Sequence, residues 1–213
     1  MKFIALALFF TAFGINAQAD VFRHPLTPQT QSAFLATSLR LAEQPFIRGD
    51  FELERTLTRL NRSIRSSGTF IIAAQLGMLW DTASPFPSTL VMGEDFLIQS
   101  RPGGQRTVLS AQGNETFLRM AEVISAVFSG NAQRLVDNFA VYYSGSPASW
   151  ELGLIPLDRA INVFAERITM RGDTVIRSIH ITEQNGDSIQ YLLSNHSFPA
   201  ALPDDEQALF ALP

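Results

Sequence analysis

The sequence predicts a mainly β protein of the α+β type, in which helices cover a strongly curved antiparallel sheet. Apolar residues alternate with polar residues through several segments of strand length. Turn-forming residues such as Asn185-Gly186-Asp187 separate neighbouring segments, and two stretches, 27–43 and 114–129, have helical periodicity instead. We expect about nine to eleven strands, and an antiparallel sheet of that size must curl.

The first 19 residues predict a secretory signal peptide. Lys2 precedes an apolar run from Phe3 to Ile15, and Ala17-Gln18-Ala19 has the small-residue pattern of a cleavage site. The apolar run is too short to be a good membrane span. We therefore expect cleavage after Ala19 and a single exported domain over residues 20–213, located in the periplasm.

The composition excludes several kinds of chemistry. The chain has no cysteine, so it has neither disulfides nor a thiolate metal site, and Lys2 is its one lysine. Once the signal peptide is removed, Schiff-base chemistry and lysine-dependent phosphate loops are excluded. The remaining 15 arginines face 20 acidic residues, and this acidic balance argues against a nucleic acid partner.

The mature chain is expected to begin with an amphipathic helix and a long strand. Thr27 is a suitable N-cap for a helix over Thr27–Glu43, because Pro28 follows it at the first helical position. A strand over Phe46–Leu57 follows, with alternating apolar and acidic residues. The apolar stripe expected on the helix consists of Phe34, Leu35, Ser38, Leu39 and Ala42.

Four arginines lie close together from the last residues of this strand up to the next predicted one, in a segment that we expect to be rich in turns. They are Arg55, Arg59, Arg62 and Arg65, and the segment ends with Ser66-Ser67-Gly68. Arginine suits bidentate contacts with phosphate or carboxylate groups. These residues are therefore candidates for contact with a lipid headgroup or an acidic partner, and the alternative is a solvated sheet edge.

The stretch Thr69–Ser100 predicts consecutive antiparallel strands. Gly77, Pro85 and Gly93 interrupt it, so one long helix is excluded. Apolar side chains fall on even-numbered positions, and we expect them to form one broad face rich in Phe, Met and Trp. The candidate ligand-binding residues on this face are Phe70, Ile72, Met78, Trp80, Phe86, Leu90, Met92, Phe96 and Ile98.

The second half of the chain continues with a hairpin turn, a helix and further strands. Helix 114–129 has an apolar face that must cover another element. We expect strands at 105–111, 135–143, 148–155, 167–171, 174–184 and 188–195, a helical turn within 157–165, and a short C-terminal helix capped by Asp204. These segments add the candidate ligand-binding residues Phe117, Met120, Ile124, Phe128 and Trp150.

Nearly the whole mature chain resembles the LolA-like periplasmic carriers of outer-membrane lipoproteins, especially a divergent branch. The most specific motif is Gly77-Met78-Leu79-Trp80 with Pro85-Phe86 five residues on, and FELERTL, SSGTF and IHITEQNGDSIQYLLSN also match. The resemblance implies an unclosed half-barrel covered by helices, with an apolar cavity for acyl chains. The better-known carriers have an arginine on the strand before the tryptophan, whereas the matching segment here, Ile72–Leu76, has none.

We therefore expect a carrier or chaperone that binds lipid or lipoprotein acyl chains in an apolar half-barrel cavity and transfers them toward the outer membrane. Flexible methionine and aromatic side chains suit an acyl ligand of variable shape. The resemblance implies an inner-membrane exporter as donor, an outer-membrane acceptor and a monomeric carrier. The alternative is a non-transporting envelope accessory protein that binds a protein partner through the sheet edge and the Arg-rich segment, with the apolar face as filled core.

An enzyme is disfavoured. The sequence has no Gly-x-Ser-x-Gly motif, and Asp137 and Asp158 are single carboxylates without an evident partner. The three histidines, at positions 24, 180 and 196, are too scattered to predict a metal site. We expect no catalytic residue, no metal and no cofactor.

Overall fold

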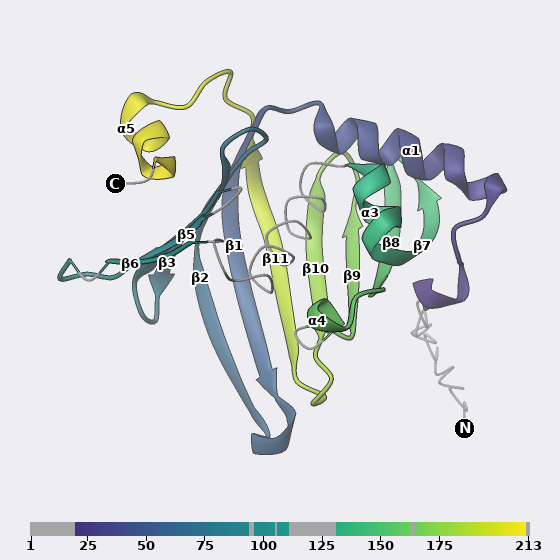
Figure 1. Cartoon of the computed structure of the whole chain (residues 1–213), viewed down its shortest axis with the longest axis horizontal. Helices are drawn as coiled ribbons and strands as arrows, with labels where there is room; N and C mark the ends of the chain where they lie inside the picture. The colour runs from purple at the N-terminus through teal and green to yellow at the C-terminus, as the bar shows by residue number, and fades with distance from the viewer. Residues whose placement is uncertain (1–19, 94–95, 105, 111–130, 163–164, 212–213) are drawn as a thin grey trace, which may run out of the picture.

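The computed structural model of the chain describes residues 20–93, 96–104, 106–110, 131–162 and 165–211 (Figure 1). Two predictions lie outside these residues. One is the signal peptide, and the other is the helix over 114–129 with its candidate residues Phe117, Met120, Ile124 and Phe128.

The described residues contain an antiparallel sheet of 11 strands in the order β6-β5-β4-β3-β2-β1-β11-β10-β9-β8-β7. This order consists of two meanders whose first and last strands, β1 and β11, pair in the middle of the sheet. The first meander contains β1 (Phe46–Leu57), β2 (Arg62–Ala73), β3 (Gly77–Ser84), β4 (Ser88–Met92), β5 (Phe96–Ser100) and β6 (Arg106–Ser110). The second contains β7 (Phe139–Ser146), β8 (Ser149–Pro156), β9 (Arg167–Gly172), β10 (Ile176–Thr182) and β11 (Ser188–Ser197).

The sheet is strongly curled and does not close, since β6 and β7 lie at its two ends (Figure 1). This confirms the prediction of a mainly β, unclosed and curved sheet. The described helices are α1 (Pro28–Ala42), α3 (Ala132–Asn138), α4 (Arg159–Asn162) and α5 (Asp204–Gln207), with 3-10 turns η1 (Val21–Arg23), η2 (Thr58–Leu60) and η3 (Ala208–Phe210).

Helix α1 begins as expected but turns a different face to the sheet. Thr27 and Thr30 form a capping box, and Pro28 occupies the first helical position. The buried residues are Phe34, Thr37, Ser38 and Leu41. The expected stripe was wrong at Leu35, Leu39 and Ala42, which are exposed, because the helix is rotated so that Thr37, which hydrogen-bonds Tyr143 of β7, faces the sheet.

The two faces of the sheet carry separate apolar clusters. We call the face that packs against α1 and α3 the inner face and the opposite one the outer face. The inner cluster extends across the sheet and includes Phe51, Phe70, Tyr143, Trp150, Leu152, Leu154, Ile168, Met170, Ile179 and Leu193. The outer cluster is smaller and consists of Ile71, Ala73, Leu79, Val91, Phe96, Ile98, Leu202 and Phe210.

The C-terminal segment covers the outer cluster. Leu202 and Phe210, on either side of α5, are both buried against strands of the first meander. Glu206 of α5 forms an ion pair with Arg48 of β1. The predicted terminal helix is therefore confirmed, but Asp204 is its first residue and Pro203 occupies the N-cap position, so the predicted Asp204 cap was wrong.

Two expected elements were wrong. The segment 62–68 is the first half of β2 and not a turn, because it pairs with β1 along its whole length. Its Gly68 permits close approach of β3, since a Cβ there would lie 1.9 Å from the carbonyl oxygen of Asp81. The expected strand over 135–143 begins instead with α3, whose N-cap Asn131 accepts a hydrogen bond from the Arg134 N–H at 3.1 Å.

Candidate functional site

Four aromatic residues form a group on the inner face where β1, β2, β3 and β11 lie side by side. Trp80 stacks on Phe70, with ring centroids 5.4 Å apart, and its ring lies 5.5 Å from that of Phe51. Tyr191 meets Trp80 edge-on at 5.7 Å. The strand register explains the group. Phe70 of β2 pairs with Trp80 of β3. Phe51 of β1 pairs with Leu193 of β11, and Tyr191 lies two residues before Leu193 on the same face.

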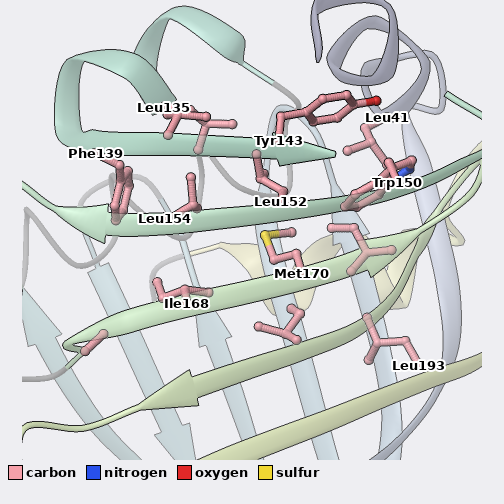
Figure 2. Close-up of a cluster of buried hydrophobic side chains, with 14 of the residues drawn as sticks. Leu41, Leu135, Phe139, Tyr143, Trp150, Leu152, Leu154, Ile168, Met170 and Leu193 are labelled. Carbon is pink, nitrogen blue, oxygen red and sulfur yellow. The ribbon is translucent and has the colours of Figure 1, made fainter. Parts of the chain in front are cut away.

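The helices cover the part of the inner face formed by the second meander. Figure 2 shows Leu41 of α1 and Leu135 of α3 together with side chains that project from β7, β8 and β9. Leu154 and Met170 are completely buried there. This part of the inner face is filled by the protein's own side chains.

A buried hydrogen bond fixes α1 to this filled part. The hydroxyl groups of Thr37 and Tyr143 lie 2.7 Å apart. Burial raises the pKa of the Tyr143 phenol, and the hydrogen bond with Thr37 opposes that rise. Trp150 is held in a similar way, since its indole N–H donates to the carbonyl of Asp173 at 2.7 Å.

The inner face is more accessible toward the first meander. Leu53, Trp80, Leu90 and Tyr191 are half-buried, and Ile64 is 46% exposed. We call these five residues the accessible region. It is apolar and adjoins the filled part through the aromatic group, so the inner face offers a continuous apolar surface that is only partly covered by described residues.

A charged pair lies at the end of the accessible region. Arg55 is on the inner face between Ile64 of β2 and Ile189 of β11, and its guanidinium contacts the Glu183 carboxylate at 2.9 Å. The Arg55 Nε is buried and makes no hydrogen bond within the described part of the chain. Burial raises the pKa of the nearby Tyr191 phenol, and the charge of Arg55 opposes that rise. The Arg55–Glu183 pair therefore places charged groups beside the apolar surface of the accessible region.

The structure brings together most of the described candidate residues predicted for the ligand-binding face. Register aligns Ile72 with Met78 and Met92, and Phe70 with Trp80 and Leu90, all on the inner face. Trp150 lies on the same face but in the filled part, and it is 3% exposed.

Three of the expected positions were wrong. Phe96 and Ile98 lie on the outer face, because Val91 pairs with Ile98 and the next pair is Met92 with Leu97. Even-numbered parity therefore does not continue from β4 into β5. Phe86 lies in the turn between β3 and β4, where it is 80% exposed.

The four arginines do not form one cluster. Arg55 and Arg62 belong to the inner face, whereas Arg65 projects from the outer face toward Glu54, at 3.4 Å. Arg59 lies in η2 at the tip of the β1–β2 hairpin. The spacing in sequence could not reveal this separation, since it depends on the strand that β2 forms.

Sequence reasoning missed Leu53, Glu183 and Tyr191 as members of the site. Glu183 and Tyr191 belong to the last hairpin, and only the pairing of β1 with β11 brings them next to Arg55 and Trp80. The alternation of apolar residues in Ser188–Ser197 was the available signal for Tyr191. No local signal identified Glu183.

Within the described ranges, no three His, Cys, Asp or Glu side chains are grouped so that they could hold a metal ion. The same part of the chain contains no helix that is long and apolar enough to cross a membrane.

A protein-family comparison gives a match over most of the chain. A family model described as outer membrane lipoprotein carrier protein LolA-like matches residues 34–213. No match was found among curated protein sequences.

The solved structures that match this chain share little sequence with it. A LolA superfamily protein from Nitrosomonas europaea is 11% identical, with a TM-score of 0.48, over 83% of this chain and 96% of that one. Lipoprotein LppX from Mycobacterium tuberculosis is 11% identical, with a TM-score of 0.42, over 79% and 98%. LprF from Mycobacterium bovis is 10% identical, with a TM-score of 0.37, over 85% and 98%.

Proposed function

This chain belongs to the LolA-like family of outer membrane lipoprotein carrier proteins, and we propose that it is a periplasmic carrier. In this proposal it binds lipid or lipoprotein acyl chains on the inner face of the sheet and passes them toward the outer membrane. It performs no chemical step and needs no cofactor. The signal peptide expected at residues 1–19 would direct it to that compartment.

The observation that carries this proposal is the accessible region of the inner face. Its half-buried Trp80 and Tyr191 adjoin a filled apolar core instead of a polar surface. Exposed apolar area of this kind is unfavourable in water and is stabilised when a ligand covers it. An acyl chain lying beside Leu53, Trp80 and Leu90 would remove that area from water.

The hydrophobic effect is large enough for such a carrier. Burial contributes about 0.8 kcal/mol per CH₂, so a 16-carbon chain gives an upper bound of about 12 kcal/mol. Ordering the chain and the protein reduces this value. Release is easier if side chains of the protein, such as Trp80 and its aromatic neighbours, pack on one another when the ligand leaves.

The Arg55–Glu183 pair supports a place for the headgroup. It lies at the end of the accessible region, where the N–H of the buried Arg55 Nε is available to donate a hydrogen bond. A phosphate or carboxylate accepts charge-assisted hydrogen bonds from such a guanidinium. We propose that the headgroup, or the modified end of a lipoprotein, lies near Arg55, with Arg62 as the next cation on the same face.

The two tryptophans offer a direct test. Trp80 lies in the accessible region and Trp150 in the filled part, so a brominated fatty acid should quench the first and spare the second. We would titrate it into the Trp150→Phe protein, whose emission comes from Trp80, and into the Trp80→Phe protein as the matched control.

Saturable quenching in Trp150→Phe, with little in Trp80→Phe, is the expected result. Absence of quenching in both proteins, together with no lipid bound to protein purified from the periplasm and weighed by native mass spectrometry, would reject the proposal. The same mass spectra would identify a natural cargo by its mass.

A further inference from the structure

The first half of β2 has an unpaired edge. β2 pairs with β1 along all its residues, but its pairing with β3 begins only at Ser67, opposite Ser84. Figure 1 shows the β1–β2 hairpin extending beyond the end of β3. We call Arg62–Ser66 the free edge. Its outward backbone groups have no strand partner among the described residues.

An edge of this kind is a template for another strand. Arg62, Ser63, Ile64 and Arg65 are all exposed. At one end of the free edge lies the β3–β4 turn, with the 80% exposed side chain of Phe86. Natural proteins usually shorten or cover such edges, whereas this one is five residues long and uncovered by any described residue.

The charges on the free edge select its partner. Arg62 and Arg65 flank Ile64 on opposite faces of the strand, and the five residues contain no acidic group. Arg62, like Arg59 in the adjacent turn, makes no ion pair with a described residue, while Arg65 has only the 3.4 Å contact with Glu54. An incoming strand with acidic residues opposite the two arginines would be favoured.

A second copy of this chain fits the free edge poorly. Antiparallel pairing of two copies about Ile64 would place Arg62 opposite Ser66 and Arg65 opposite Ser63, so the two Arg65 side chains would be diagonal neighbours and neither segment could supply a carboxylate. Like charges in neighbouring strands are destabilising. The partner is therefore a different polypeptide.

We propose that the free edge binds an extended segment of a partner protein by strand addition. The segment has two acidic residues three positions apart that enclose an apolar residue, and in antiparallel pairing these lie opposite Arg65, Ile64 and Arg62. The pairing contacts the backbone of the free edge, its two arginines and Ile64, and it needs no acyl chain. It therefore goes beyond the carrier proposal, and either can fail without the other.

The probe is an unacylated eight-residue peptide whose centre reads Asp-Val-Thr-Asp, measured by fluorescence anisotropy against the full mature chain. We expect saturable binding and slower amide hydrogen exchange at residues 62–66. The double variant Arg62→Glu/Arg65→Glu should bind about tenfold more weakly, since two cross-strand charge pairs become repulsive. The matched control Arg101→Glu/Arg106→Glu, which changes two exposed arginines elsewhere, should bind as the wild type does.

Three further peptides test the charge pairing and the backbone pairing separately. A Lys-Val-Thr-Lys peptide should bind the Glu double variant and not the wild type. Of two peptides N-methylated at alternate amides, one should lose binding and the other keep it, because only one edge of the peptide faces β2. Absence of saturation by about 1 mM peptide, equal loss in the control variant, or equal binding of both methylated peptides would overturn the proposal.

Discussion

The outer cluster and the accessible region of the inner face are both apolar, but they differ in how far the chain covers them. The outer cluster is largely aliphatic, with Leu79 and Val91 buried beneath Leu202 and Phe210 of the same chain. The accessible region contains the aromatic residues Trp80 and Tyr191 beside three aliphatic ones, and its side chains are half-buried or exposed. A cluster that its own chain completes contributes to folding, whereas a surface left partly open can contribute to binding.

The largest expected effect concerns the outer cluster. Leu79→Ala should lower the free energy of unfolding by about 2–5 kcal/mol, because it leaves a cavity at a residue that is 4% exposed. Urea denaturation measures this loss. Acyl-chain affinity, measured well below the unfolding temperature, should be unchanged. Loss of binding by the folded variant would break the distinction between the two surfaces.

A matched pair of leucines sharpens the distinction. Leu53 lies half-buried on the inner face of β1, and Leu192 lies on the outer face of the neighbouring β11, where it is 46% exposed. Leu53→Asn should weaken acyl-chain binding by about tenfold, because an amide must then lose water when the ligand arrives. Leu192→Asn should leave the affinity unchanged in the same titration. Equal effects of the two changes would mean that the acyl chain does not lie on the inner face.

Substitutions in the filled part of the inner face should change the free energy of unfolding and leave acyl-chain affinity unchanged. Tyr143→Phe removes the hydroxyl that lies 2.7 Å from Thr37, so unfolding should become easier by about 1 kcal/mol. Thr37→Val removes the other hydroxyl, and a double-mutant cycle between the two changes isolates their interaction. A coupling energy near zero would show that this hydrogen bond does not hold α1 in place.

The smallest expected effect is a dependence on pH. Burial and the Arg177 charge lower the pKa of His196, and burial and Arg171 lower that of His180. Each imidazole binds its proton less readily when folded, so the free energy of unfolding should fall as the pH drops from about 7 through the ordinary value of 6.5. The double variant His180→Gln/His196→Gln should show a flatter profile between about pH 7 and 5. An unchanged slope would assign the effect to other groups.

Alternation and turn residues predicted much of the sheet. β1 has the expected bounds, and Trp150, Leu152 and Leu154 share a face as their spacing indicated. Such patterns succeed within a single strand because side chains alternate strictly there. They failed from β4 to β5, because Ile98 pairs with Val91 and so lies on the outer face, as Phe96 does.

Other features depend on contacts that are distant in sequence. The segment around Arg62 and Arg65 looks like a turn in isolation, and its partner β1 makes it a strand. Residues 135–138 were predicted as strand but belong to α3, because a short apolar run such as that around Leu135 fits a strand and a helix alike. The Arg55–Glu183 pair joins residues that only the β1–β11 pairing brings together.

That central pairing also sets the order in which the molecule can be completed. Phe51 of β1 cannot pair with Leu193 of β11 until Leu193 has been synthesised, about 140 residues later. Until then, one long edge of β1 has no strand partner in the nascent chain, and the two meanders remain separate parts of the sheet. A chain of this topology is exposed to mispairing for nearly the whole of its synthesis. Because β11 joins the two meanders in the middle of the sheet, the protein becomes a single folded unit only after β11 has been synthesised.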